Sequence, residues 1–216
     1  MQKTRVMTAT DTATTDPRPL LRRVVDQTDR LIAGLRPDQL DLPTPCADWT
    51  VRDLVSHLVA VENRIVHIAG GGHPFEVPSM STDVADDQWY AAWLGNRARV
   101  EEALADDRVL DSTFAHPAGE MPGHRALVFY ASEFAAHGWD LAAALGVPTV
   151  DLDDGAALAI LGPLGAALPA EPRGGRVPFG AVVPVPADAP AYDRLVGWLG
   201  RDPSWRQDAT TVATTR

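Results

Sequence analysis

Several features are scarce in this sequence of 216 residues, and each absence excludes a class of protein. The only cysteine is Cys46, so no internal disulfide can form, and such usage is typical of a reducing compartment. No apolar run approaches the roughly 20 residues that a membrane-spanning helix needs. The N-terminus lacks the basic-then-apolar order of a secretory signal. We therefore expect a cytoplasmic protein with no membrane partner.

Basic residues are also few, and two common catalytic patterns are missing. The chain has 29 acidic residues against 19 Lys and Arg, a formal charge of −10, and an acidic surface repels nucleic acid. Gly70, Gly71 and Gly72 are not followed by the Lys-Ser/Thr of a phosphate-binding loop. No Ser-His-Asp arrangement has supporting context. We expect small molecules rather than nucleic acid as partners.

Helical periodicity is the main structural signal in the sequence. Apolar residues recur at helical spacing over residues 19–35, 50–69, 83–105 and 124–145. Thr50 and Asp53 have the spacing of a capping box, and Gly146 followed by Pro148 is a typical helix end. Four long helices joined by loops predict an all-α fold, an antiparallel four-helix bundle over residues 17–146.

A short C-terminal extension, residues 147–205, is expected to pack on the bundle. It contains a predicted helix at 153–168, a proline-interrupted stretch at 176–186 and a terminal helix at 191–199. The stretch RVPFGAVVPVP predicts an edge strand or an extended arm, because proline cannot donate to a sheet. Residues 1–16 and 206–216 are polar and Thr-rich, which predicts disordered tails.

The first candidate site lies in SEFAAHGWDLAAALG, within the fourth predicted helix. Glu133 and His137 are four residues apart, so they share one helix face with Cβ atoms about 5–6 Å apart. A carboxylate and an imidazole at this spacing can bind one divalent cation. The spacing also fits a plain Glu–His hydrogen bond, or a solvated Glu beside a core His.

His57 is the third candidate ligand. It lies at the border of the apolar face of the second predicted helix and can point into the same cleft, although a lone His there also fits a satisfied core residue. Two His and one Glu form a catalytic zinc set with a fourth position left for water or substrate. Asp140, one turn after His137, either orients that ligand through a hydrogen bond or bonds to the backbone.

The other reactive side chains are weaker candidates. Cys46 in TPCADW has no neighbouring His or basic residue to lower its pKa, so a packed structural thiol is expected rather than a nucleophile. His67 lies ten residues from His57, on a different part of the second helix. The remaining histidines lie in or beside loops, where solvated side chains are expected; they are His73, His116 and His124.

Two motifs carry a resemblance to a known family. TPCADWTVRDLVSHLV, followed downstream by EFAAHGWDLAAALG, resembles the DinB-like superfamily of metal-binding four-helix bundles. The closer resemblance, over residues 18–205, is to the mycothiol-dependent maleylpyruvate isomerase-like branch of actinobacteria, and the C-terminal stretch resembles a little-characterised subfamily of it. It implies a metal, zinc or else nickel, held by His57, Glu133 and His137. The isomerase has a larger C-terminal domain than residues 147–205 provide.

The resemblance implies a metal-dependent enzyme that uses the thiol mycothiol as cosubstrate in S-transfer to, or isomerisation of, a small electrophile. Metal coordination deprotonates thiols, and the resulting thiolate is the nucleophile that such a reaction needs. A non-catalytic bundle that binds a metal or ligand is the alternative, and a metal-assisted hydrolase is the third hypothesis. The chain is expected to be a monomer or a homodimer.

Overall fold

The computed structural model of the chain describes residues 16–174 and 179–207. Within them the main elements are α1 (Arg18–Ala33), α2 (Val51–Ala69), α3 (Trp89–Ala103), α4 (Gly123–Ala144), α5 (Asp154–Ala167) and α6 (Ala191–Trp198). A short antiparallel hairpin, β1 (Thr113–Phe114) with β2 (Met121–Pro122), precedes α4. None of the described helices combines the length and the apolar character that crossing a bilayer requires.

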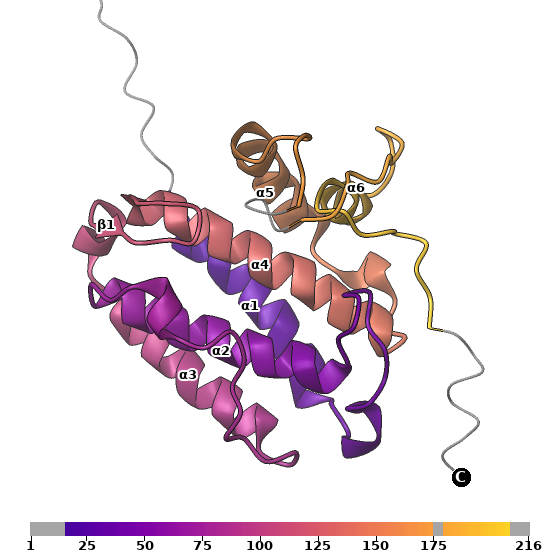
Figure 1. Cartoon of the computed structure of the whole chain (residues 1–216), viewed down its shortest axis with the longest axis horizontal. Coiled ribbons are helices and arrows are strands. Elements are labelled where there is room, and N and C mark those ends of the chain that lie inside the picture. The colour runs from indigo at the N-terminus through magenta and orange to yellow at the C-terminus, as the bar shows by residue number, and fades with distance from the viewer. Residues whose placement is uncertain (1–15, 175–178, 208–216) are drawn as a thin grey trace, which may run out of the picture.

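Helices α1 to α4 form a bundle in which α4 is central. It packs along α1 and α2, and α2 also packs on α3 (Figure 1). Helices α5 and α6 pack on each other and on α4, and in the view of Figure 1 they lie on the opposite side of α4 from α2 and α3. The predicted all-α fold built on four bundle helices is confirmed.

Local sequence explains where the helices begin and end. The predicted capping box opens α2, since the Asp53 backbone N–H donates to Thr50 Oγ1 at 3.3 Å and the Thr50 N–H donates to the Asp53 carboxylate at 2.9 Å. Gly123 starts α4 against the carbonyl oxygen of Val109, where an added Cβ would lie only 2.0 Å away. Gly146 then ends the helix with φ of 68°, a conformation that favours glycine.

The bundle core is built from large apolar side chains contributed by all four helices. Trp93 of α3 meets Phe134 of α4 edge to face, with ring centroids 5.9 Å apart, and its indole N–H donates to Asp29 of α1 at 3.0 Å. Burying one such side chain contributes roughly 1.5–3 kcal/mol. Trp93 thus ties α3 to both α4 and α1.

The prediction that the third helix starts at residue 83 is wrong. Residues 83–88 form turns, and α3 begins at Trp89. Three of these six residues are aspartates, which disfavour a helix interior, whereas Trp89 is the first residue of the segment to be buried in the core.

The proline-interrupted stretch forms an extended arm in its described part, residues 179–186, and not an edge strand. The Val183 N–H donates to the carbonyl of Gly197 in α6 at 2.9 Å, and the prolines at 184 and 186 have no N–H to extend a ladder. Residues 175–178 lie outside the described residues, and so do 1–15 and 208–216 of the predicted tails. Asp16 is ordered, because it accepts hydrogen bonds from Arg18.

Candidate metal centre

The three predicted ligands lie together between α2 and α4. His57 comes from α2, while Glu133 and His137 come from successive turns of α4. His57 Nε2 is 3.0 Å from Glu133 Oε1, and the two imidazole rings have centroids 5.0 Å apart. Each residue offers one ligand atom, and these three atoms lie within 4.8 Å of one another. This spacing suits a single ion with nitrogen and oxygen ligands.

The far side of each imidazole is fixed by a hydrogen bond. His57 Nδ1 is 2.8 Å from the carbonyl oxygen of Ser79, and His137 Nδ1 is 2.9 Å from Asp140 Oδ2. Both partners are acceptors, so each Nδ1 carries the proton. Because Nδ1 is bonded on the far side, each ring turns Nε2 toward the centre of the group. This is the usual second bond of metal-binding histidines.

The contact between His57 and Glu133 needs a positive charge. With its proton on Nδ1, His57 presents a lone pair to a carboxylate that has only acceptors, 3.0 Å away. A proton on Nε2 would turn this contact into an ion pair. A metal ion satisfies the same two atoms and His137 as well.

Glu133 is ionised and accessible. Burial raises the pKa of this carboxyl, but the hydrogen bond with His57 and the charges of His137 and His57 outweigh it and lower the pKa to about 2. The Glu133 side chain is 35% exposed, against 9% for His57. The group can therefore be reached from the Glu133 side.

Asp140 joins the candidate centre to the C-terminal extension. It is fully buried on α4, where it accepts from His137 and from Arg201, which follows α6. Burial raises the pKa of Asp140, but the Arg201 charge and the His137 hydrogen bond outweigh this and lower the pKa to about 2. Of the two roles that the sequence left open for Asp140, the geometry favours the hydrogen bond to His137.

Cys46 lies nearer to charged groups than its sequence neighbours suggest. Its Sγ is 3.7 Å from His137 Nδ1, 3.2 Å from Asp140 Oδ2 and 3.5 Å from Arg201 Nη2. The premise that no His or basic group is near is therefore wrong. Burial and the Asp140 charge nevertheless outweigh the Arg201 charge and raise the pKa of Cys46 to about 12, which disfavours the thiolate. Cys46, His137 and Asp140 also cluster as potential ligands, but the Arg201 guanidinium already pairs with Asp140 there.

Three contributors to the candidate site were missed in the sequence. The Trp49 ring stacks on the His137 ring with centroids 5.7 Å apart, and its centroid is 5.0 Å from that of the His57 ring. Trp49 therefore forms one side of the site. Its place three residues after Cys46, in the same short motif, was an available signal. Ser79 acts through its backbone carbonyl, which any residue type would provide. Arg201 acts through Asp140, 61 positions away in the sequence, so no local pattern could reveal it.

The other histidines lie outside this group. His67 pairs with Glu76 at 2.6 Å, and His124 bonds to the Leu110 carbonyl. His116 is not a solvated side chain as predicted, because its ring packs on Phe129 and Tyr130 and burial lowers its pKa to about 4.

Residues 21–142, which include all three candidate ligands and most of the four bundle helices, match a family model described as the mycothiol maleylpyruvate isomerase N-terminal domain. The chain belongs to this family. The predicted resemblance to the DinB-like, maleylpyruvate isomerase-like branch is thereby confirmed.

Relatives and solved structures agree with this family assignment. Two Mycobacterium tuberculosis proteins, uncharacterized protein Rv0738 of strain H37Rv and uncharacterized protein MT0763 of strain CDC 1551, are each 34% identical over 186 residues. The match covers 86% of this chain and 98% of each relative. Crystal structures of the mycothiol-dependent maleylpyruvate isomerase and of a point mutant align over 68% of each chain with a TM-score of 0.55, at 14% and 13% identity. That likeness supports the DinB-like fold.

Proposed function

We propose that this member of the family is a divalent-metal-dependent enzyme that uses a low-molecular-weight thiol, mycothiol, on a small electrophile. The observation that carries the proposal is the convergence of His57 Nε2, Glu133 Oε1 and the free nitrogen of His137, with both Nδ1 atoms already bonded elsewhere. Family membership supports the thiol. Nitrogen and carboxylate ligands favour zinc, with nickel as second choice.

The residues fit such an ion in number, type and charge. His57, Glu133 and His137 provide three ligand atoms, and a tetrahedral ion would keep one position for a small molecule. His57 Nε2 and the Glu133 carboxylate face each other at 3.0 Å, a contact between two electron-pair donors that a cation stabilises. A divalent cation held there would supply the positive charge that favours the deprotonated form of a thiol at neutral pH.

The protein's own groups have distinct roles in this proposal. Ser79 and Asp140 hold the two imidazoles in the tautomer that directs Nε2 inward. Glu133 contributes one negative charge and borders the accessible side of the group. Trp49 stacks on His137 and packs at a tilt against His57, so it covers one side of the two imidazoles. Arg201 compensates the buried Asp140 charge.

Isomerisation and S-transfer use the same first half of the reaction. In both, the thiol loses its proton and an S–C bond forms with the electrophile. In isomerisation that bond breaks again and the thiol is released unchanged, whereas in S-transfer the bond remains in the product. The product's sulfur content therefore distinguishes the two reactions.

Metal content is the first test. Protein purified without chelator should carry about one divalent metal per chain by elemental analysis, as a single three-ligand site requires. His57→Ala and His137→Ala should lose most of it, while His73→Ala, a loop histidine outside the group, should keep it. Equal metal in wild type and His137→Ala contradicts the proposed centre.

Thiol dependence is the second test. Wild type should consume members of an electrophile panel only when mycothiol is present, and His137→Ala should not. Turnover without any thiol would instead indicate the metal-assisted hydrolase. Stoichiometric metal without turnover of any panel member would favour the non-catalytic binding bundle.

A further inference from the structure

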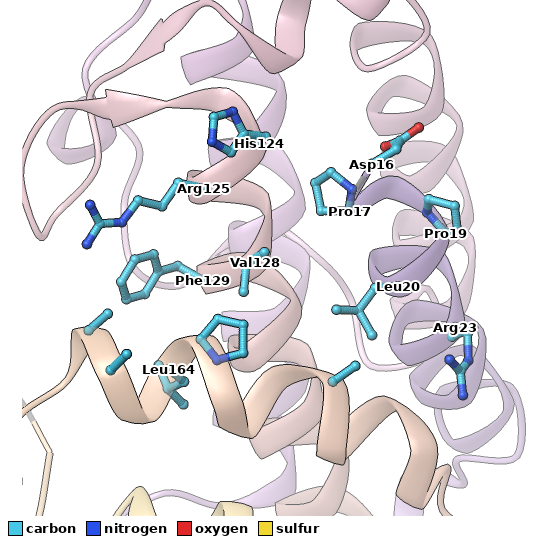
Figure 2. A pocket seen from close by; sticks show the side chains of 14 residues that line it. Asp16, Pro17, Pro19, Leu20, Arg23, His124, Arg125, Val128, Phe129 and Leu164 are labelled. Atoms are coloured by element: carbon cyan, nitrogen blue, oxygen red, sulfur yellow. The ribbon is translucent and has the colours of Figure 1, made fainter. Parts of the chain in front are cut away.

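A hollow separate from the candidate metal centre lies on the side of α4 that packs against α1 and α5. It is a groove of about 850 Å³ between the start of α1, the first half of α4 and α5 (Figure 2). Its walls are apolar, and the main contributors are Pro17, Leu20, Val128, Phe129, Pro163 and Leu164. A volume of this size is typical of small-molecule sites.

The groove is separate from the proposed metal chemistry. Neither α2 nor any of the three candidate ligands lines it. Val128 and Phe129 turn toward the groove from α4, whereas Glu133, one turn later, faces His57 of α2. A molecule in the groove would therefore bind without contacting the ligand group.

Helix α5 is almost entirely apolar, although part of its surface is exposed to solvent. After Asp154, its remaining residues through Ala167 contain no charged or polar side chain, and a helix that is apolar all round is normally covered on every side. Ile160 and Leu164 face the core, but the opposite side is open, with Leu158 57% exposed. Part of this uncovered surface, including Ala159 and Pro163, forms one wall of the groove.

One positive charge at the groove is not neutralised by the described residues. Arg23 pairs with Asp153, and Asp16 pairs with Arg18. Arg125 is exposed beside Phe129 at one side of the groove and makes no ion pair or hydrogen bond within the described parts of the chain (Figure 2). In a chain of net charge −10, an unpaired guanidinium there attracts an anionic group, and it binds a carboxylate through two parallel hydrogen bonds.

We propose that this groove binds an amphiphilic carboxylate, a molecule with an apolar acyl body along α1, α4 and α5 and a carboxylate at Arg125. The apolar walls would pack against the acyl chain, and the unpaired guanidinium of Arg125 would bind the carboxylate. Residues 1–15, which continue from Asp16 at the groove's rim, are polar and Thr-rich and do not match these walls.

The test is titration calorimetry, in which dodecanoate is added to the full-length protein. We expect saturable 1:1 binding. Ala159→Trp fills the groove and should abolish it, while Leu158→Trp, which places the same indole at an exposed neighbour outside the lining, should not. Arg125→Gln should weaken dodecanoate binding about tenfold or more and leave dodecanol binding unchanged. Arg30→Gln, which removes the same charge from the exposed side of α1, should have no effect.

Four outcomes would overturn the proposal. The first is no saturable binding to the full-length chain. The second is loss of binding in His57→Ala, which would place the carboxylate at the metal centre. The third is binding that appears only after deletion of residues 1–15, which would mean that this segment occupies the groove. The fourth is a dimer that Ala159→Trp dissociates in sedimentation velocity, which would assign the groove to a second copy.

Discussion

Arg201 donates from Nη2 to Asp140 Oδ2 at 2.9 Å, and through Asp140 it reaches the imidazole of His137. This ion pair is almost entirely removed from water, since the Asp140 side chain is 0% exposed and that of Arg201 is 14% exposed. It links the segment after α6 to the middle of the bundle. Two of the following predictions concern this link.

Removal of Arg201 should destabilise the fold. Arg201→Ala leaves the buried Asp140 carboxylate without its cation, which typically costs about 3–5 kcal/mol. Urea unfolding measures the free energy directly. Arg108→Ala, which removes a 90% exposed arginine paired with Asp106, should leave the free energy of unfolding nearly unchanged. If the two variants lose similar free energies of unfolding, the buried Asp140–Arg201 pair stabilises the fold no more than an exposed pair does.

Asp140→Asn should weaken metal binding. The amide oxygen can still accept from His137, but the negative charge that strengthens this ligand is lost, and such changes typically reduce metal affinity 10–100-fold. Competition with a chromogenic chelator gives the zinc affinity. Asp111→Asn, at an exposed turn, is the matched control. An unchanged affinity in Asp140→Asn would contradict the orienting role.

Glu62 should make the fold less stable at high pH. Burial raises the pKa of this α2 carboxyl to about 9; the Arg97 charge opposes the rise. The unfolded group ionises near its ordinary pKa of 4.5, so its contribution to stability is complete below that pH and is lost as the pH rises toward 9. The loss is at most about 1.4 kcal/mol for each pH unit.

Glu62→Gln tests this effect, because glutamine does not titrate. The variant should match the wild-type Tm near pH 5 and exceed it increasingly between pH 6 and 8.5. Glu102→Gln, an exposed change on α3, should follow the wild type throughout. Parallel pH profiles for wild type and Glu62→Gln would show that the buried carboxyl does not titrate as described.

Zinc should stabilise the folded protein through the proposed centre. A ligand at a hundredfold excess over its Kd contributes about 2.7 kcal/mol, which for a chain of this size raises Tm by roughly 5–10 °C. Differential scanning fluorimetry of chelator-stripped protein measures the shift. His57→Ala should show little of it, and His73→Ala should retain it. A shift of equal size in His57→Ala would place the zinc elsewhere.

The helices were predictable because their determinants are local. Apolar periodicity gave α1, α2 and α4 within about two residues, and the Thr50–Asp53 capping box gave the start of α2 directly. The start of α3 was not predictable in this way. Val84 and Ala85 continue an apolar pattern, but the neighbouring aspartates interrupt it. Whether such a segment enters a helix depends on what the bundle buries, and periodicity does not show this.

The candidate site was predictable only in part, for a similar reason. The four-residue spacing of Glu133 and His137 is written in the sequence, and His57 lies on a face that the bundle turns toward them. The groups that orient these side chains are contributed by Ser79 and Arg201, which meet them only through tertiary packing. The environment of Cys46 was misjudged because its charged neighbours are 91 or more residues away in sequence.

Asp140 and Arg201 are 61 positions apart in the sequence, and this separation also sets an order of events during synthesis. All four bundle helices leave the ribosome before Arg201 is translated, so a nascent bundle contains Asp140 without its cation. The hydrogen bond between Asp140 and His137 gains the neighbouring Arg201 charge only when the segment after α6 docks on the bundle. A segment made after every bundle helix thus completes the surroundings of His137.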